Sequence, residues 1–482
     1  MKAVKFLIIL LASLGVTETY AFCGFYVAKT DANLFNNKSE VIYVRDGKKS
    51  TITMSNDFDG EVKDFAMVVP VPVVLEEQDI KVVDRGIFEK LHDYSAPRIV
   101  EYYDQNPCQP VYEEVMVQKD LARAESVTES LSMNMAVEDD YQVTIEAEYE
   151  VGEYDILILS AKESDGLKRW LIDNGYKIPN QAEEVLQPYI RSKMKFFVVK
   201  VNLEKYNQSG FEYLSPIQIS FEDNRFMLPL RLGMANSKGS QDMLMYFFTK
   251  NGRVESTNYR TVEVPSNRNI PLFVEPKFQD FYRDLFKNAY HEENENAVFV
   301  EYAWDVSPSA GVKCDPCVSP PPVFTEFQKA GVDWVSGMNR SSQVFFTRLH
   351  VRYTRNDFPQ DLFFQETPNS ERFQGRYVIT HPAKGDFSCD EGQAYLKELE
   401  RRRKKEMDEL VALTGWKDKY GENYVKEFSN RIKEESTPVV SPSDNDGSGG
   451  GGFAPQSLYL LSLLALVGVA WMLQFNFNRM EV

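Results

Sequence analysis

Hydrophobic runs of strand length dominate the first part of the chain. Residues 40–45 and 50–54 flank Asp46-Gly47-Lys48-Lys49, a pattern typical of a β-hairpin. Residues 65–74 form a longer hydrophobic run that predicts a buried strand. Because a proline cannot donate a backbone hydrogen bond, the prolines at 70 and 72 exclude a central position in a sheet there. We expect a β-rich subdomain over residues 22–150.

A different pattern occupies the centre of the chain. Residues 154–160 predict a strand, and a helix follows after Ser164 and Asp165, which can cap it. A second helix is predicted over residues 180–190, and residues 195–203 predict a return strand. Residues 151–210 are therefore expected to form a strand-helix-helix-strand insertion.

Strands and then one long helix are expected toward the end of the body. Residues 349–355, 362–366 and 375–381 predict strands within a second β-rich subdomain, residues 211–389. A charged helical segment, residues 390–433, follows, and its helix is expected to stop at Thr414-Gly415. One face of this helix carries an apolar stripe: Leu396, Leu399, Met407, Leu410 and Leu413.

Both ends of the chain carry hydrophobic segments of other kinds. Residues 1–21 have the charge, length and small residues of a signal peptide, with cleavage expected after Ala21. A Gly-rich flexible linker, residues 434–452, precedes an apolar stretch, residues 453–476, long enough to span a bilayer. Arg479 in the tail, residues 477–482, places that tail in the cytoplasm and the body outside. A sorting signal that is removed after use fits the same C-terminal pattern.

Composition and charge narrow the class of protein. The 482 residues carry 54 basic and 72 acidic side chains, a formal net charge of −18. This acidity argues against a nucleic-acid partner, because phosphate binding needs a basic surface. We expect an α+β fold, a β-rich exported body with helical insertions and one C-terminal transmembrane helix, in the bacterial cell membrane with the ectodomain facing the periplasm or cell exterior.

One pattern resembles an internal duplication. Val100-Glu101-Tyr102 and Val300-Glu301-Tyr302 each precede a Pro- and Cys-containing stretch. A strand with prolines and then a helix are expected upstream of each, over residues 71–94 and 264–290. Chance similarity of two strand-helix-strand units is the alternative, and the sequence leaves both open.

Several separated motifs resemble a bacterial exported family known as domain of unknown function 2330. They are Phe22-Cys23-Gly24-Phe25-Tyr26-Val27-Ala28, Phe65-Ala66-Met67-Val68-Val69-Pro70-Val71-Pro72, Ala96-Pro97-Arg98-Ile99-Val100-Glu101-Tyr102, Asn258-Tyr259-Arg260-Thr261, Thr347-Arg348-Leu349-His350-Val351-Arg352-Tyr353, Phe364-Gln365-Glu366-Thr367 and Phe373-Gln374-Gly375-Arg376-Tyr377. The resemblance implies export from the cytoplasm and carries no activity or catalytic residues with it.

The five cysteines, Cys23, Cys108, Cys314, Cys317 and Cys389, are the candidates for disulfide or redox chemistry. In an oxidising compartment they are expected to pair where geometry allows, and their odd number leaves one over. Cys314-Asp315-Pro316-Cys317 has the spacing of redox motifs, but its Pro-rich surroundings indicate a loop rather than a helix start. A structural disulfide, or pairing with Cys108 or Cys23, is the favoured interpretation.

Other polar residues offer weaker candidates. The chain has four histidines, and His350 lies in an alternating strand where a surface or cross-strand role is the default. Glu138-Asp139-Asp140 is read as solvated surface, and the basic run 401–405 as a solvated helix face with ion pairs to neighbouring acids. No spaced metal-ligand set or phosphate loop is recognised, so no cofactor is expected.

These observations favour a non-enzymatic envelope protein with a structural or interaction role and an unidentified envelope protein or polymer as partner. The alternative is an extracytoplasmic enzyme with thiol-disulfide chemistry at Cys314 and Cys317. The redox role requires exposed sulfurs beside a helix start. The interaction role predicts an exposed apolar patch and no cleft with converging polar groups.

Overall fold

The chain forms a mixed α and β fold in a computed structural model that describes residues 25–26, 35–36, 39–55, 58–59, 66–109, 142–174, 182–209, 214–234, 239–336, 341–416 and 424. All of them belong to one compact unit, residues 1–434. The expected signal peptide (1–21), linker (434–452), membrane span (453–476) and tail (477–482) lie outside the described residues. Within the described ranges, no helix combines the length and apolar character that crossing a membrane requires.

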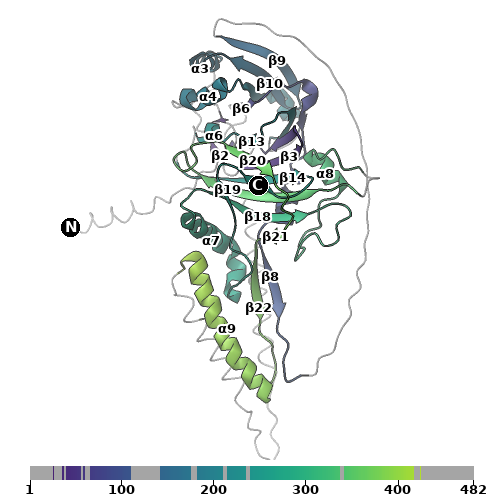
Figure 1. The fold of residues 1–482 in the computed structure, drawn as a ribbon, viewed down its shortest axis with the longest axis vertical. Helices are drawn as coiled ribbons and strands as arrows, with labels where there is room; N and C mark the ends of the chain where they lie inside the picture. The colour runs from purple at the N-terminus through teal and green to yellow at the C-terminus, as the bar shows by residue number, and fades with distance from the viewer. Residues whose placement is uncertain are drawn as a thin grey trace, which may run out of the picture. The chain divides into compact units, whose positions relative to one another are not determined.

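A nine-stranded sheet forms the centre of the unit (Figure 1). Eight strands follow one another across it: β16 (Arg260–Glu263), β18 (Ala297–Asp305), β19 (Phe345–Tyr353), β14 (Gln241–Thr249), β3 (Ser39–Asp46), β4 (Lys49–Met54), β12 (Ile217–Glu222) and β7 (Ile80–Val82). The ninth, β21 (Phe373–Gln374), pairs with β18. The predicted hairpin is confirmed as β3 and β4, and Gly47 has the positive φ, 57°, that its tight turn needs.

The central insertion is part of a second, five-stranded sheet. Its order is β1 (Phe25–Tyr26), β6 (Ala66–Val71), β11 (Lys195–Val201), β10 (Tyr154–Ala161) and β9 (Val143–Val151). The predicted strand-helix-helix-strand order is confirmed by β10, α3 (Ser164–Asp173), α4 (Ala182–Arg191) and β11. On its other side, the described part of β1 pairs with β6 at Met67 and Val68 and does not reach Pro70, which pairs with Phe196 of β11.

The start of α3 differs from the prediction. Glu163 occupies the N-cap position and makes no side-chain cap hydrogen bond. Ser164 is already helical, and its hydroxyl donates to Gln187 Oε1 of α4 at 2.6 Å. The serine was available to cap α3, but its hydroxyl joins the two helices instead.

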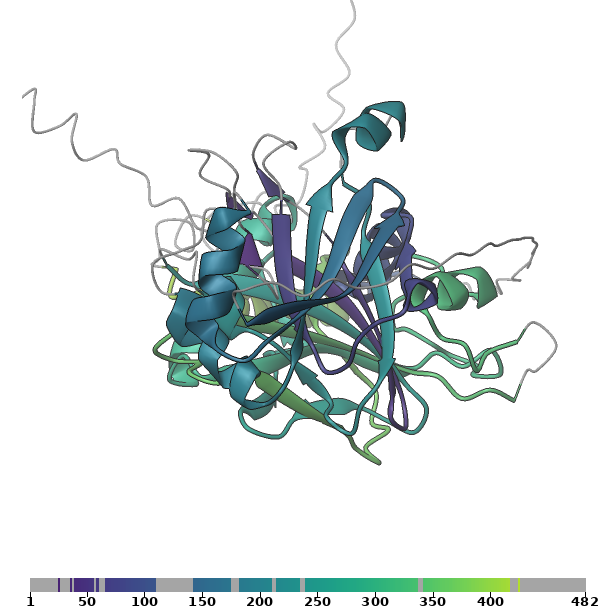
Figure 2. The same cartoon turned by 90° about the horizontal axis from the view of Figure 1, so that it is seen from above.

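The two sheets and their helices form layers. Alternate residues of both sheets, such as Val69 and Phe247, meet in one shared core. The outer face of the five-stranded sheet packs on α3 and α4, which lie side by side in Figure 2. The other face of the nine-stranded sheet packs on α2 (Gly86–Ser95) and α8 (Phe324–Ala330).

A further layer of helices and strands contains the predicted helix that begins at Asp390. It contains η3 (Leu272–Lys277), α7 (Phe278–Glu292), α9 (Asp390–Thr414) and a sheet of β17 (Arg268–Asn269), β22 (Arg376–His381) and β8 (Arg98–Tyr103). The helix prediction is confirmed: all five stripe residues of α9 are buried, and Gly415 ends the helix with φ 68°.

Smaller elements complete the described fold. A three-stranded sheet is formed by β13 (Met227–Leu228), β20 (Leu362–Glu366) and β15 (Val254–Ser256), and β2 (Phe35–Asn36) pairs with β5 (Phe58–Asp59). Short helices are η2 (Glu77–Asp79), α5 (Leu203–Ser209) and α6 (Arg231–Met234).

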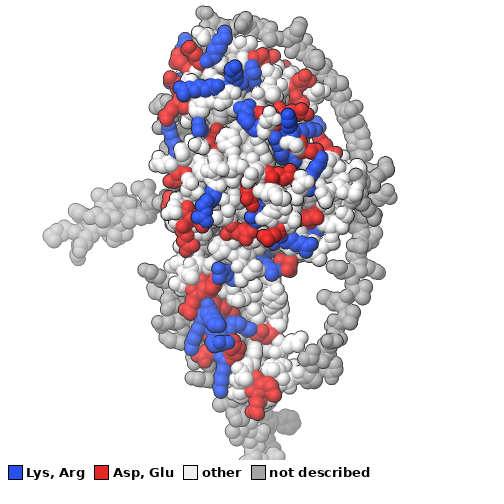
Figure 3. Space-filling model, viewed as in Figure 1, with Lys and Arg blue, Asp and Glu red and all other residues white. Residues whose placement is uncertain are grey.

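The basic run 401–405 is less solvated than predicted. Figure 3 shows Lys and Arg side chains gathered along α9 among acidic ones. Arg401 and Lys404 form the expected surface ion pairs with Glu398 and Glu400. Arg403, in contrast, is fully buried and pairs with Glu406 at 2.7 Å, because the run turns through the helix and one member meets the protein interior.

The two expected subdomains contribute strands to one sheet, and the two parts of the expected duplication differ in their strand pairing. Strand β3 from residues 22–150 pairs in parallel with β14 from residues 211–389, so one sheet contains both. Val100–Tyr102 lies on β8, parallel to β22, whereas Val300–Tyr302 lies on β18, antiparallel to β19. The described strands that carry the two tripeptides are therefore paired differently, and no repeat at this spacing is seen in them.

Candidate functional site

The cysteines of the described chain form two disulfides. Cys108, just after β8, is bonded to Cys389 across 281 residues, with the two Cα atoms 5.8 Å apart. Cys389 caps α9, its sulfur accepting the Gly392 amide at 3.2 Å. A Cβ at Gly392 would lie 2.6 Å from the Cys108 sulfur, so glycine is required there. Cys23 lies outside the described residues.

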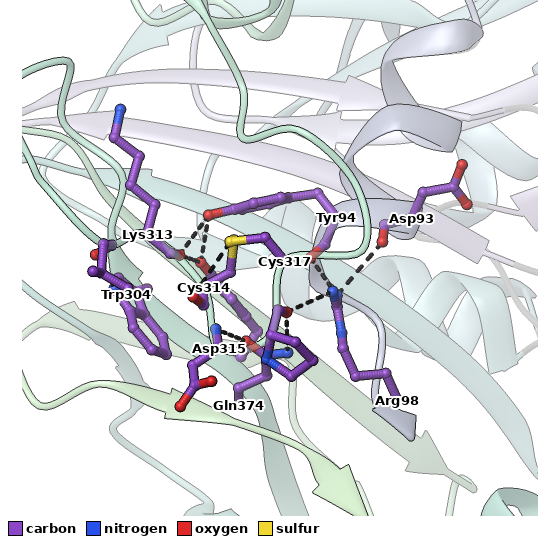
Figure 4. The surroundings of a disulfide bond; sticks show 12 residues. Asp93, Tyr94, Arg98, Trp304, Lys313, Cys314, Asp315, Cys317 and Gln374 are labelled. Atoms are coloured by element: carbon purple, nitrogen blue, oxygen red, sulfur yellow. Dashed lines mark hydrogen bonds between the residues drawn. A yellow bond between two sulfur atoms is a disulfide. The ribbon is translucent and has the colours of Figure 1, made fainter. Parts of the chain in front are cut away.

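The second disulfide joins Cys314 and Cys317 in the loop between β18 and α8 (Figure 4). Tyr94 holds this loop by donating to the Lys313 carbonyl at 2.6 Å, and Arg98 donates to the Pro316 carbonyl at 3.3 Å. Cys314 is buried and Cys317 is exposed. The next helix, α8, begins only at Phe324, so the motif does not sit at a helix start.

A second candidate site lies on one face of β19. Arg348, His350 and Arg352 alternate with Leu349 and Val351, so the charged side chains share one face and the aliphatic ones face the core between the sheets. Helices α2 and α7 lie over this charged face but cover it only in part. The cross-strand alternative predicted for His350 is confirmed, because its partners Glu301 and Asp242 lie on the neighbouring strands β18 and β14. The surface alternative is wrong, since the side chain is only 13% exposed.

Glu301 lies at the centre of these charges. The register of β18 against β19 shifts between Val300 and Tyr302, so Glu301 is the extra residue of a β-bulge. Its carboxylate is fully buried and accepts from Arg348 Nε at 2.6 Å and from His350 Nδ1 at 2.8 Å. The Tyr282 hydroxyl of α7 donates to the same carboxylate.

Asp242 of β14 closes the network on the other side of the histidine. It accepts from His350 Nε2 at 3.2 Å and from two nitrogens of Arg352, at 2.9 and 2.7 Å. The Phe286 ring of α7 stacks on the imidazole, with the ring centroids 3.8 Å apart. Both ring nitrogens of His350 are therefore bound to carboxylates, and one face is covered.

The electrostatics of the cluster favour the charged forms of Glu301, Asp242 and His350. Burial raises the pKa of Glu301, but Arg348 and His350 outweigh burial and hold that pKa well below its ordinary value. Burial likewise raises the pKa of Asp242, and hydrogen bonds from His350 and Arg352 lower it further than burial raises it. For His350 burial lowers the pKa, but the two carboxylates raise it above its ordinary value.

These charges form the floor of a groove of about 610 Å³, the size of a small-molecule site. One wall is the first half of α7, with Phe278, Gln279, Tyr282, Arg283 and Phe286. The opposite wall is the end of α2 and the following turn, with His92, Ala96 and Pro97. Leu244 joins Asp242, Glu301, Arg348, His350 and Arg352 in the floor.

The arrangement is suited to binding and ordering charge rather than to moving protons. A general base needs a free nitrogen or oxygen at the reacting group. His350 has neither ring nitrogen free, and both carboxylates are engaged by cations. The floor instead presents guanidinium and imidazolium groups in fixed positions.

The other predicted polar candidates lie elsewhere. His291 pairs with Glu295 at 2.6 Å, and His381 with Glu101 at 2.8 Å. Glu138-Asp139-Asp140 falls outside the described residues. Among the side chains that the structure describes, no three acidic, histidine or cysteine groups are placed to hold a metal ion.

The expectation that an interaction protein has no cleft with converging polar groups is wrong for this chain, because the groove is such a cleft. Two signals in the sequence pointed to it. Charged residues at alternate positions of the strand 348–352, with aliphatic residues between them, are unusual for a strand that the structure places between two others. Glu301 within the hydrophobic run Val298–Trp304 is the second signal, because a lone carboxylate in such a run needs a buried cation.

Comparison with known proteins gives one match. A family model described as an uncharacterized protein conserved in bacteria (DUF2330) matches residues 17–365, which include every residue of the groove but not Cys389 or α9. No curated protein and no solved structure matches the chain.

Proposed function

Because the chain belongs to this family of uncharacterized proteins conserved in bacteria, whose description assigns no activity, we propose a function from the groove itself. The protein is a non-enzymatic binding module of the bacterial cell envelope that takes its ligand between α7 and the nine-stranded sheet. The observation that carries this proposal is the groove of about 610 Å³ with a fully paired ionic floor.

The ionic floor supports binding because it is costly to build. Several kcal/mol of desolvation accompany each buried ion, and only good geometry and added hydrogen bonds offset that cost. Here Glu301 and Arg348 are 0% and 3% exposed, yet they lie beside an open groove rather than in the shared core. A pre-ordered floor of this kind lowers the entropy that a ligand must lose on binding.

Location in the envelope is supported by the sequence. The signal-like residues 1–21 and the apolar residues 453–476 predict export and one membrane span, with the body outside the cytoplasm. Two disulfides fit an oxidising compartment. The groove would then face the periplasm or the cell exterior, where an envelope component is the expected partner.

Binding is tested with two bicyclic probes, 2-naphthamide and 2-naphthoate. Ligand-observed NMR on the full chain in detergent micelles, with empty micelles as blank, should detect at least one of them at sub-millimolar affinity. Ala96→Trp fills the groove and should abolish the signal. Val411→Trp, on the exposed side of α9, is the matched control and should leave it unchanged. Absence of binding by both probes, or binding that survives Ala96→Trp, overturns the proposal.

Location is tested by proteolysis of spheroplasts from cells that express the full chain. Added protease should degrade the body and leave a short C-terminal fragment, and N-terminal sequencing of the mature chain should begin at Phe22. A body that resists protease until the membrane is broken, and still begins at Met1, contradicts the envelope assignment.

The geometry does not favour the thiol-disulfide alternative. A reactive thiolate is stabilised by a helix N-terminus or a nearby cation. The Cys314–Cys317 loop has no helix start, and Cys314 is 3% exposed. The cations beside the loop donate to other groups: Arg98 to the Pro316 carbonyl and Arg376 to Asp315. Mass spectrometry of the unreduced chain should show both disulfides, and mild dithiol treatment should leave Cys314–Cys317 oxidised. Rapid thiol-disulfide exchange at Cys314–Cys317 would instead support the redox alternative.

A further inference from the structure

We propose that the groove recognises a small organic anion with an aromatic or apolar body, an inference that rests on the proposed binding function. Two features of the groove carry it. The floor offers more hydrogen-bond donors than acceptors, and the walls are largely apolar.

The donor excess follows from the groups that form the floor. Two guanidinium groups, the imidazole held between two carboxylates and the Tyr282 hydroxyl carry about thirteen N–H and O–H donors, and eight hydrogen bonds inside the protein use part of them. The carboxylates of Glu301 and Asp242 carry about eight acceptor positions, and six of those hydrogen bonds end on them, so donors outnumber acceptors after the internal pairing as well. A ligand that reaches the floor is therefore recognised through its own acceptor atoms.

The charges of the floor point the same way. Arg348, Arg352 and protonated His350 supply three positive charges against two negative ones, in a chain whose net charge is −18. Arg283 on the rim is bound to two carboxylates, Asp280 and Asp284, so this rim group is net negative and the positive excess belongs to the floor alone. An organic cation would meet two carboxylates whose oxygens already accept from Arg348, His350 and Arg352.

The walls define the rest of the ligand. Phe278 and Tyr282 lie one helical turn apart on α7, and both rings are partly exposed. Pro97 and Leu244 complete the apolar lining. Aromatic and aliphatic surfaces of this kind bind a flat or apolar body, while the polar floor fixes its anionic end.

The test compares the two naphthyl probes on the unmodified full chain. 2-Naphthoate and 2-naphthamide have nearly the same shape and differ in charge, so their affinity ratio isolates the anionic end. A charge-assisted hydrogen bond predicts that 2-naphthoate binds at least about tenfold more tightly. Isothermal titration at neutral pH, with empty micelles as blank, gives both affinities.

Three variants locate the effect. Arg352→Gln should bring the affinity for 2-naphthoate close to that for 2-naphthamide, and Arg401→Gln, which removes the same charge from exposed α9, should leave the ratio unchanged. Phe278→Ala should weaken both probes. Circular dichroism establishes that each variant is folded, and the ratio on the unmodified chain needs no variant.

The outcomes separate the two proposals. If both probes bind in the groove with equal affinity, or the amide binds more tightly, the anion inference is overturned and the binding function stands. If neither probe binds, both are overturned. Preference for 2-naphthoate that Arg352→Gln removes and Arg401→Gln retains supports both.

Discussion

The tripeptide Val-Glu-Tyr occurs at 100–102 and again at 300–302, and in both places its glutamate binds a histidine. Glu101 contacts His381 at 2.8 Å, and Glu301 contacts His350 at 2.8 Å. Each histidine also stacks on an aromatic ring, Tyr103 at 4.4 Å and Phe286 at 3.8 Å between centroids. Residue types and distances are nearly the same in the two regions.

The surroundings of the two pairs differ completely. The side chains of Glu101 and His381 are 40% and 27% exposed, so the pair is open to solvent. Glu301 is 0% exposed, and its charge persists only because Arg348 and His350 lie against it. Exposed ion pairs contribute little to stability, whereas removal of one buried partner leaves an uncompensated charge. The comparison teaches that burial, not contact distance, makes the second pair part of a site.

The largest expected effect is that of neutralising each glutamate. Glu301→Gln leaves buried Arg348 without its counter-ion and should lower the free energy of unfolding by about 3–5 kcal/mol. Glu101→Gln should change it by about 0.5 kcal/mol or less. Urea unfolding of the full chain at neutral pH measures both. Equal losses in the two variants would contradict the role assigned to burial.

A smaller effect is expected for the stacked rings. Phe286→Leu removes a buried ring and its stacking on His350, and should cost about 1–2 kcal/mol of unfolding free energy. Tyr103→Leu, at a ring that is 70% exposed, should stay within about 0.5 kcal/mol. The same urea titrations provide the measurement. A loss at Tyr103 as large as that at Phe286 would show that the exposed pair is also held by packing.

The smallest effect is a change in the pH dependence of stability. The pKa of His350 is raised in the folded chain, so its contribution is complete below its unfolded pKa and is lost as pH rises through the folded value. Glu301 and Asp242 have lowered pKa values, so their contributions are present at neutral pH and are lost only in acid.

The unmodified chain should therefore lose stability between pH 6 and pH 9 by more than His350→Gln does. Arg348 and Arg352 stay charged over this range and do not add to the slope. His381→Gln is the matched control on the exposed pair and should follow the unmodified chain. Urea midpoints of each variant at pH 6 and pH 9 test this prediction. An equal loss of stability in His350→Gln would refute the contribution assigned to His350.

Local patterns were sufficient for much of the fold. The hairpin of β3 and β4, the β10-α3-α4-β11 order and the end of α9 at Gly415 each depend on residues close together in the sequence. Turn residues, apolar spacing and a positive-φ glycine determine such elements. The strand β14 was missed, because its apolar run gives no periodicity that separates a strand from a helix.

The groove depends on contacts that no local pattern contains. It forms only after β14, β18 and β19 pair and a bulge turns Glu301 toward Arg348. The cysteine pairing has the same character, since five cysteines allow several connectivities and only the fold brings Cys108 to Cys389. Ser164 was misplaced for the same reason. Its local sequence predicts a helix cap, but its hydroxyl donates to Gln187 of the next helix, a partner that only the fold supplies.

Under the proposed export, the separation of 281 residues from Cys108 to Cys389 sets a schedule for biogenesis. A chain that threads through a secretion channel from its N-terminus delivers Cys108 early and Cys389 only after nearly the whole body has emerged. The first thiol must wait in its reduced form, or in an exchangeable mixed disulfide, through most of translocation. Gly392 leaves room for the sulfur only against the first turn of α9, so covalent closure marks the arrival of the last described helix.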